Sequence, residues 1–397
     1  MKRSSDHSRG GLGPVFRKFE HAALRAVAHV LLPRPEPPFD RNRVRKILVY
    51  GTMGIGNIVM LTPTLRALRQ GFPNAHITLL AGASGGDQVV SGGGLVDEII
   101  RRQVRLRDLA ALAWRIRRRR FDLMVSTIHG DGGYLPWITA LSGVPTRAGH
   151  STGPDWIGRN DFLYNVPVSM PEGQHEVERG LLLAEALGCD TTDRRPSFHF
   201  DDADRFFAGQ FLARAGILAG DWLLGVQVGT WKFQDWKQWD LDRLAEACDR
   251  LIAEEGVKVV LLGSPSDRDV LDRLLGFMTH RPIIALGESS LKQSAAIVQK
   301  CHATLCNDSG LMHVSAAVGT PVVAVFGPTD RRRTGPWGPG HVVVTKNVDC
   351  SPCFTLAELW TAKTALSCTH HKCLKEITVQ DVVGSVKGIK VRTETRG

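Results

Sequence analysis

The stretch Lys46-Ile-Leu-Val-Tyr-Gly51-Thr-Met-Gly-Ile-Gly56-Asn57 sets the expected fold of this 397-residue chain. Its first part, residues 46–50, is an apolar run bounded by glycine, which is typical of a parallel strand buried on both faces. The glycines that follow allow a tight turn, and residues 58–70 have the pattern of a helix. A strand, a glycine-rich loop and a helix in this order predict the start of a doubly wound α/β domain.

The same alternation of apolar runs and helical stretches continues along the chain. Further strands are expected at residues 77–81, 96–100, 122–127, 223–228, 257–263, 282–286, 303–306 and 321–326. The alternation pauses around residues 195–220, and the chain exceeds the size at which a single core stops growing. We therefore predict two Rossmann-like domains. The expected division is an N-terminal extension at 1–45, a first domain at 46–200, a linker at 201–220, a second domain at 221–385 and a tail at 386–397.

Charge is distributed unevenly. The net charge is +10, and basic residues gather in three clusters: one contains Arg41, Arg43, Arg45 and Lys46, and the others are 115–120 and 331–333. Such clusters suit phosphates, acidic lipids or nucleic acid, although the 115–120 run also fits a solvated helix face. No spacing typical of a nucleic-acid-binding motif accompanies them, so we expect no nucleic-acid partner.

The first residues of the chain are basic and amphipathic. Between residues 16 and 30, apolar residues recur at helical spacing while basic residues fall on other faces. This pattern predicts a helix that lies either on an anionic membrane surface or on the protein itself. No secretory signal pattern is present, and no apolar run approaches the ~20 residues that span a bilayer. We expect a cytoplasmic protein with reduced cysteines, peripheral on the inner face of the inner membrane if the helix binds lipid.

The segment Asn307-Asp-Ser-Gly-Leu-Met-His313 follows a predicted strand and opens a predicted helix. Ser309 is expected to cap this helix, leaving the amides that follow it free to bind a diphosphate. Asp308 would accept hydrogen bonds from sugar hydroxyls. His313 is four residues after Ser309, on the same face of the predicted helix, and is therefore near enough to contact the ligand. The alternative is an ordinary capped helix with a surface histidine. As exposed positions, Asp308 and His313 should tolerate alanine within about 1 kcal/mol of stability.

A lysine that precedes this segment in the sequence could also bind a diphosphate. Lys237 follows the first strand of the second domain, where its ammonium group could stabilise a departing nucleotide; a solvent-facing lysine is the alternative. A dinucleotide-binding enzyme would need a carboxylate near the end of its second strand, but here that strand ends Leu79-Leu80-Ala81-Gly82. The sequence therefore disfavours an NAD-linked oxidoreductase.

Residues 46–69, 229–239 and 307–329 together resemble the lipopolysaccharide heptosyltransferases, and the resemblance extends over about 45–385. It implies the GT-B fold, in which two Rossmann-like domains with parallel sheets face a central cleft. It also implies transfer of heptose from ADP-heptose to a lipid-linked glycan acceptor in the lipopolysaccharide core, with inversion and without a required cofactor or metal. By the same resemblance, the donor would be bound by Thr230, Lys237, Asp267 (at the ribose), Asp308, Ser309, Gly310 and His313, and the glycine loop would include Gly54 and Gly56.

One departure from the family concerns the catalytic base. Members commonly have an aspartate after the last glycine of the first loop, where this chain has Asn57. An amide accepts no proton near neutral pH, whereas an aspartate is ionised there. His129 and Asp131 lie in the loop after a predicted strand and are the alternative bases. If neither of these residues acts as the base, the chain would be a non-catalytic nucleotide-sugar-binding protein.

Four cysteines lie close together near the C-terminus. Cys350 and Cys353 form one close pair, and Cys368 and Cys373 form another. Two such pairs can hold zinc tetrahedrally, and similar pairs occur in the family that the chain resembles. Unliganded thiols are the alternative.

Overall fold

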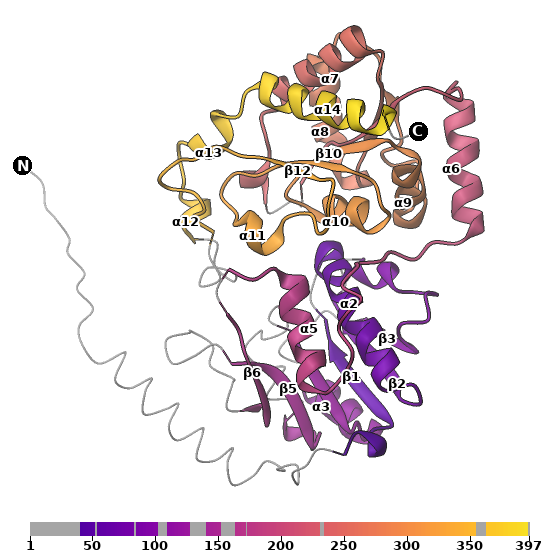
Figure 1. Ribbon diagram of the computed structural model, residues 1–397, viewed down its shortest axis with the longest axis vertical. Coiled ribbons are helices and arrows are strands. Elements are labelled where there is room, and N and C mark those ends of the chain that lie inside the picture. Colours follow the sequence, from indigo (N-terminus) through magenta and orange to yellow (C-terminus); the bar gives the residue numbers. More distant parts are fainter. Residues whose placement is uncertain are drawn as a thin grey trace, which may run out of the picture.

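The computed structural model contains two α/β domains, each built on a parallel sheet, stacked one above the other (Figure 1). It describes residues 40–51, 54–82, 85–101, 109–127, 140–151, 163–171, 173–230, 234–354 and 363–395. Both sheets have six strands, ordered β3-β2-β1-β4-β5-β6 and β12-β11-β10-β7-β8-β9. Counted from the first strand of each domain, the two orders are identical. The predicted pair of Rossmann-like domains is confirmed.

The first domain begins with the predicted strand at the centre of its sheet. Its strands are β1 (Lys46–Tyr50), β2 (His76–Ala81), β3 (Glu98–Arg101), β4 (Leu123–Ser126), β5 (Thr146–Ser151) and β6 (Val166–Ser169). Its helices are α2 (Ile55–Gly71), α3 (Leu109–Arg119) and α5 (Glu176–Ala186), with 3-10 turns η1 (Arg41–Arg43) and η2 (Gly86–Val89). Strands β5 and β6 were not predicted from the sequence.

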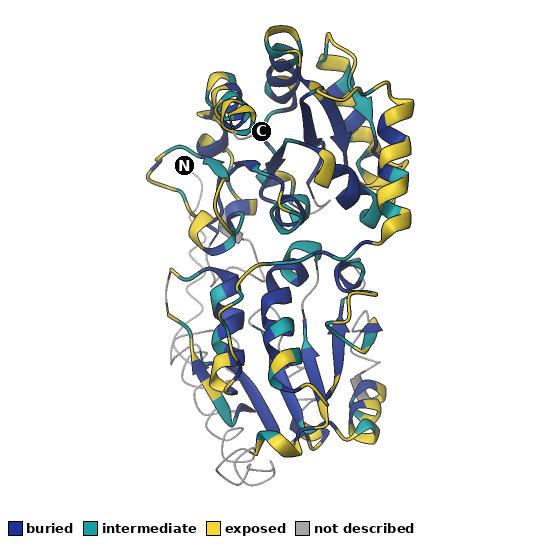
Figure 2. Cartoon of the chain, turned by 45° about the vertical axis from the view of Figure 1, so that its right-hand side comes forward, coloured by how far each residue is buried: buried dark blue, intermediate teal, exposed yellow. Residues whose placement is uncertain are grey.

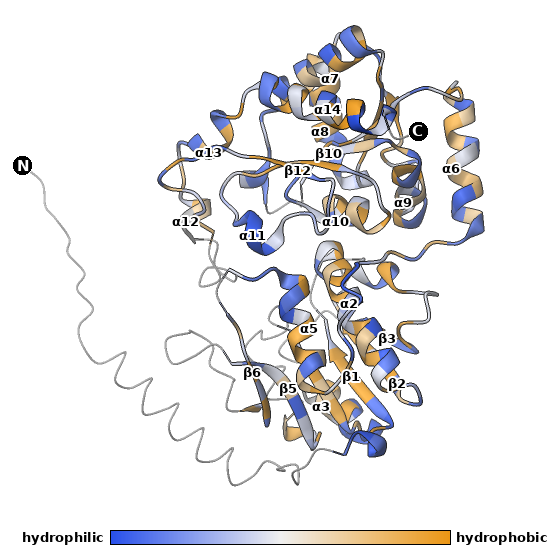
Figure 3. Cartoon of the chain, viewed as in Figure 1, coloured by the Kyte–Doolittle hydropathy of each residue, from blue (hydrophilic) through white to orange (hydrophobic). Residues whose placement is uncertain are grey.

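Side chains of the first sheet point alternately to two separate cores. Ile47 and Val49 pack with α2 and α5, whereas Leu48 packs with Leu112 and Ile116 of α3. This follows from the two-residue period of a strand. Helix α3 therefore covers the face of the sheet opposite to α2 and α5, and Figure 3 shows β1 as a hydrophobic strand between them.

The second domain repeats this plan. Its strands are β7 (Leu223–Gln227), β8 (Lys258–Leu262), β9 (Ile283–Ile284), β10 (Ala303–Asn307), β11 (Val322–Val325) and β12 (Val342–Val344). Its helices are α7 (Leu241–Glu255), α8 (Arg268–Phe277), α9 (Leu291–Lys300), α10 (Gly310–Ala317), α11 (Arg331–Thr334), α12 (Lys363–Leu366), α13 (Lys372–Lys375) and α14 (Val379–Glu394), with turns η6 (Asp235–Lys237) and η7 (Pro265–Asp267). In Figure 2 the strands of both sheets are dark blue, since most of their residues are buried.

Two boundaries differ from the sequence-based division. The expected linker contains helix α6 (Asp202–Arg214), which packs against α9. Helix α14 runs through the boundary expected at residue 385, because Val386 and Ile389 are buried in the core of the second domain. No described helix is long and apolar enough to cross a membrane. The amphipathic segment predicted before residue 40 lies outside the described residues.

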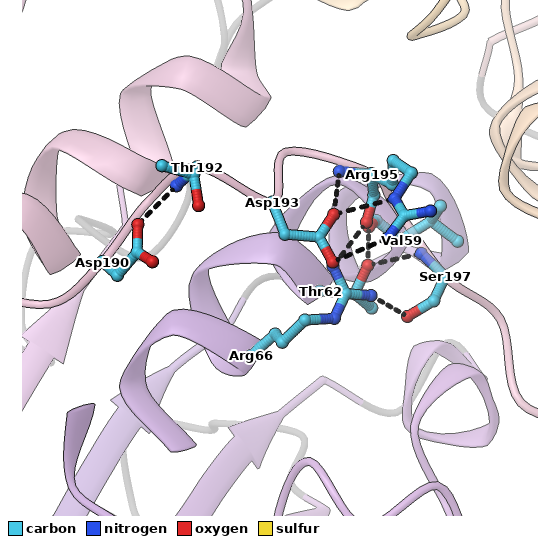
Figure 4. Close-up of polar contacts among 8 residues, drawn as sticks. All are labelled: Val59, Thr62, Arg66, Asp190, Thr192, Asp193, Arg195 and Ser197. Carbon is cyan, nitrogen blue, oxygen red and sulfur yellow. Dashed lines mark hydrogen bonds and ion pairs between the residues drawn. The ribbon is translucent and has the colours of Figure 1, made fainter. Parts of the chain in front are cut away.

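The segment that leads from the first domain to the second runs beside helix α2. Figure 4 shows the hydrogen bonds that hold residues 195–197 of this segment against α2. Arg66 of α2 donates to the carbonyl of Arg195 at 2.8 Å and to the hydroxyl of Ser197 at 3.0 Å. The amide of Ser197 donates to Thr62 Oγ1 at 2.8 Å. These contacts attach the connecting segment to α2, the helix that follows the glycine loop.

Candidate functional site

The carboxyl ends of the two sheets face each other, and the first turns of α2 and α10 meet there. A Cβ atom on Gly56 would lie 2.5 Å from Cδ2 of His313, and one on Gly310 would lie 3.2 Å from Cβ of Ile55. Both distances are shorter than ordinary contacts between carbon atoms. The absence of a side chain at Gly56 therefore lets the imidazole of the second domain rest on the glycine loop of the first.

Neither of these two helix N-termini is capped by the side chain of its described cap residue. Gly54 occupies the cap position of α2 with a φ of 111°, in the region that favours glycine. Ser309 occupies the cap position of α10, but its hydroxyl donates to Gln227 Oε1. The predicted capping bond of Ser309 is therefore wrong, because strand β7 provides a nearby amide acceptor. Two positive helix ends converge at the domain boundary, an arrangement that favours an anion.

A buried ion pair lies beside the N-terminus of α10. Lys237 Nζ lies 2.9 Å from Asp308 Oδ2, and the two side chains are 11% and 7% exposed. The same ammonium group lies 5.3 Å from the ring centroid of Trp236 and 5.9 Å from that of Phe354. Burial opposes the charge on Asp308, but the attraction of Lys237 outweighs it and lowers the pKa of that carboxyl. Lys237 is thus held in a fixed position, unlike a solvent-facing lysine.

Two polar atoms near this ion pair are buried without a hydrogen-bond partner among the described residues. They are Thr329 Oγ1 and Trp236 Nε1. Buried polar groups are hydrogen-bonded in most proteins, so an unsatisfied group needs an explanation. Two such atoms in one site, beside two helix ends without side-chain caps, indicate a place where a polar ligand completes the hydrogen bonding.

His313 and Asp308 are each only 5% exposed. The expectation that they are surface residues is wrong, because Gly56 of α2 contacts His313 and Lys237 lies against Asp308. Burial lowers the pKa of His313 to about 4, although Asp308 opposes this effect. His313 is therefore a neutral imidazole at neutral pH.

Two further predicted donor residues lie at the ends of neighbouring strands. Thr230 is buried after β7, and its hydroxyl donates to the carbonyl of Gln234 at 3.2 Å. Asp267 follows β8, where its Oδ2 atom accepts from the amide and hydroxyl of Ser264. Its other oxygen faces Gly229, since a Cβ there would lie 2.8 Å from Oδ1. The assignment of Asp267 to a ribose stays a prediction.

Asn57, at the position of the family base, lies at the domain boundary. Its side chain is still an amide, which accepts no proton near neutral pH. Asn57 occupies the first turn of α2 and is partly buried. The alternative bases, His129 and Asp131, lie outside the described residues. The identity of the base therefore stays a hypothesis.

A second polar cluster across the boundary was not found by sequence reasoning. Oε1 of Glu176 in α5 lies 3.2 Å from Arg179 Nη1 and 3.4 Å from Arg333 Nη1 of the second domain. These three side chains are at most 6% exposed. Next to them, His175 Nε2 bonds the carbonyl of Gly335 at 2.9 Å, and its ring packs on Trp337. The four-residue spacing of His175 and Arg179 was the available signal, but Arg333 is too distant in sequence to be paired with them.

None of the four C-terminal cysteines forms a disulfide within the described part of the chain. Burial and the neighbouring thiols of Cys353, Cys350 and Cys368 raise the pKa of Cys373 to about 11. Among the described residues, no three His, Cys, Asp or Glu side chains are placed so that they could hold a metal ion. The zinc hypothesis stays a prediction, and the metal content of the purified protein would test it.

Comparison with known proteins gives a consistent result. The sequence profile of glycosyltransferase family 9 (heptosyltransferase) matches residues 136–361, more than half of the chain. Lipopolysaccharide heptosyltransferase 2 of Escherichia coli K12 is 27% identical over 311 residues, covering 73% of this chain and 85% of the relative. The solved E. coli ADP-heptose heptosyltransferase II aligns with a TM-score of 0.67 at 23% identity, covering 88% and 99% of the two chains. An E. coli heptosyltransferase solved with ADP aligns with a TM-score of 0.63 at 19% identity, covering 87% and 99%.

Proposed function

Because this chain belongs to glycosyltransferase family 9, the heptosyltransferase family, we propose that it transfers heptose from ADP-heptose to the lipopolysaccharide core. The proposal includes inversion at the anomeric carbon and needs no metal ion. It places the reaction in the cytoplasm, at the inner face of the inner membrane. That it is a glycosyltransferase follows from the family; the donor, the acceptor and the stereochemistry are proposed.

The observation that carries the proposal is the convergence of two uncapped helix N-termini beside a buried lysine. A nucleotide diphosphate carries its negative charge on phosphate oxygens, which backbone amides at helix ends bind well. Lys237 adds a full positive charge within a site of low polarity, where its attraction to phosphate is stronger than in water. Thr329 and Trp236 supply the unsatisfied polar atoms that a bound donor would satisfy.

In the proposed reaction a hydroxyl oxygen of the acceptor attacks the anomeric carbon of the donor sugar. A new carbon–oxygen bond forms on one face while the bond to the diphosphate breaks on the other. The bonding electrons leave with ADP, and the hydroxyl proton passes to the base. The charge that builds on the leaving diphosphate faces Lys237 and the first turn of α10, which therefore stabilise the transition state more than the bound donor.

The second candidate is a non-catalytic protein that binds a nucleotide sugar. Asn57 favours it, since the amide at the position of the family base cannot take the proton. In this case the donor site would keep its ligand while transfer would be absent. The NAD-linked alternative has no comparable support, because the family is one of glycosyltransferases.

The test is to incubate the protein with a panel of nucleotide sugars and a heptose-deficient core acceptor, and to identify products by mass spectrometry. We expect a mass increase of one heptosyl residue with ADP-heptose and free ADP as the second product. The Lys237→Ala variant should lose more turnover than donor affinity, because its contact tightens as the leaving group becomes charged.

Three results would change the proposal. Transfer of a different sugar would replace ADP-heptose as the donor. Binding of ADP-heptose without any product across the panel would favour the non-catalytic candidate. Equal donor affinity in wild type, Asp308→Ala and His313→Ala would remove these residues from the donor site.

A further inference from the structure

The structure joins two basic clusters that are separated in the sequence. Lys46, at the start of β1, donates from Nζ to the carbonyl of Arg119 at 3.1 Å, at the C-terminal end of α3. Segments 40–46 and 109–122 together contain nine arginines and lysines but only two carboxylates, an excess of seven positive charges. The entire chain has an excess of ten, so the remainder is close to neutral. Most of the net charge therefore lies at one end of the first domain.

Helix α3 carries a basic and aromatic outer face. Leu112 and Ile116 point into the core, whereas Ala111, Trp114, Arg115 and Arg118 follow each other at helical spacing on the exposed side. The guanidinium group of Arg118 lies 4.6 Å from the ring centroid of Trp114. The helix contains no acidic residue.

Large apolar side chains are exposed within this charged region. Trp114 is 58% exposed, and Leu141 is 60% exposed. Leu141 lies beside α3, because the hydroxyl of the adjoining Ser142 donates to the carbonyl of Ala113 at 2.9 Å. Exposed tryptophan and leucine next to arginines are typical of surfaces that lie in the headgroup region of a membrane. We name Trp114, Arg115, Arg117, Arg118 and Leu141 the α3 surface.

We propose that the α3 surface binds the headgroup layer of an anionic lipid bilayer. Its arginines contact lipid phosphates, and Trp114 and Leu141 enter the interface between headgroups and acyl chains. Arg119 takes less part, since it forms an ion pair with Glu98.

The test is sedimentation of the full chain with vesicles of phosphatidylcholine alone or with anionic phosphatidylglycerol. We expect binding to anionic vesicles that weakens with salt, because screening reduces attraction between exposed charges. Each arginine near an anionic surface contributes about fivefold to partitioning. The triple variant Arg115→Gln/Arg117→Gln/Arg118→Gln should therefore lower partitioning by about 10². Trp114→Ala should lower partitioning in both vesicle types.

The matched control removes three exposed arginines elsewhere, as Arg214→Gln/Arg268→Gln/Arg273→Gln. The proposal is overturned if wild type and the α3 variant partition equally, or if the control loses as much as the α3 variant. Tight binding of wild type to an RNA or DNA oligonucleotide with no binding to vesicles would identify a nucleic-acid surface and would also overturn it. Transfer to a short soluble acceptor should be unchanged in the α3 variant. Vesicle binding needs neither donor nor acceptor, so its failure would leave the proposed reaction intact.

Discussion

The two domains share one topology but differ at the point where their first and fourth strands diverge. In the second domain this point lies between β7 and β10 and holds the buried pair of Lys237 and Asp308. In the first domain it lies between β1 and β4, where the hydroxyl of Thr127 donates to the carbonyl of Tyr50 at 3.2 Å. Within the described residues directly after β1 and β4, no side chain carries a charge.

This difference separates the fold from its chemistry. Open parallel sheets bind ligands at the switch point, but the topology does not decide which groups line it. The second domain provides charge, and the first provides a helix end and the close approach at Gly56. We infer that the second domain binds the charged donor, while the first aligns the acceptor and holds the base. The following predictions test this division.

The largest effect is expected from the base of the first domain. If His129 or Asp131 has taken over, replacing the true base by alanine should lower turnover by 10² to 10⁴, on the order expected for a general base. Asn57→Asp should then change the rate only modestly. If the family base is simply missing, Asn57→Asp should raise a low rate by a comparable factor. A wild-type rate equal to that without enzyme, unchanged by Asn57→Asp across the donor panel, would assign the chain to the non-catalytic binders.

The second effect concerns the ion pair of the other domain. Lys237→Ala leaves the Asp308 carboxylate buried without its partner, and Asp308→Ala leaves the ammonium group. Breaking a buried pair in this way costs about 3–5 kcal/mol of unfolding free energy. Urea denaturation of each variant would measure the loss.

The control for this measurement is the solvent-accessible lysine Lys387, which pairs with Glu254 at 2.9 Å and with Glu255 at 2.8 Å. Lys387→Ala should have a much smaller effect, because solvent screens an exposed pair. The double variant Lys237→Met/Asp308→Leu should recover most of the loss, since neither charge remains unpaired. Equal losses in both pairs would contradict the idea that burial distinguishes the donor side.

Much of the fold could be predicted because buried parallel strands are continuous apolar runs. The central strands β1, β7, β8 and β10 follow this rule. Strand β5 does not, because it contains Arg147, which is buried and donates to the carbonyls of Leu163 and Val144. Strand β6 contains Pro167 and lies at the sheet edge, where proline is tolerated. Such strands depend on tertiary partners that a local pattern does not reveal.

The segment after β10 lies between a strand and a helix, so the sequence singles out Asp308 and His313; their role in donor binding stays a prediction. The burial of His313 was missed, because it involves Gly56 of α2, about 250 residues earlier in the chain. The cluster of Glu176, Arg179 and Arg333 was missed for the same reason. Contacts between domains leave little trace in a single sequence.

The third prediction tests the close approach of the two domains. Gly56→Ala places a methyl group 2.5 Å from Cδ2 of His313, so the imidazole or the helix must move. Overpacking of this kind costs about 1–3 kcal/mol of stability, and turnover should fall because the two half-sites separate. Gly384→Ala in α14 is the control, since no atom lies within 4 Å of its added carbon. That substitution should slightly stabilise the helix. Unchanged stability and turnover in Gly56→Ala would show that the domains do not need this contact.

The smallest effect is a pH dependence of stability that comes from His313. Burial lowers its pKa to about 4 in the folded protein, whereas the unfolded chain keeps the ordinary value of 6.5. Between these values the unfolded state binds a proton that the folded state does not, so stability is retained above pH 6.5 and falls as the pH decreases. From pH 7 to pH 5 this histidine should account for a loss of about 2 kcal/mol. His150, which burial also brings to a pKa of about 4, should add a similar loss in the same range.

The measurement is urea denaturation at both pH values for wild type and His313→Gln. The variant should lose less stability than wild type by the contribution of one histidine, because glutamine binds no proton in either state. Since the imidazole contacts Gly56 across the domain boundary, an identical pH dependence in the two proteins would mean that His313 is solvated in solution. The two domains would then not be closed on each other in the absence of ligand.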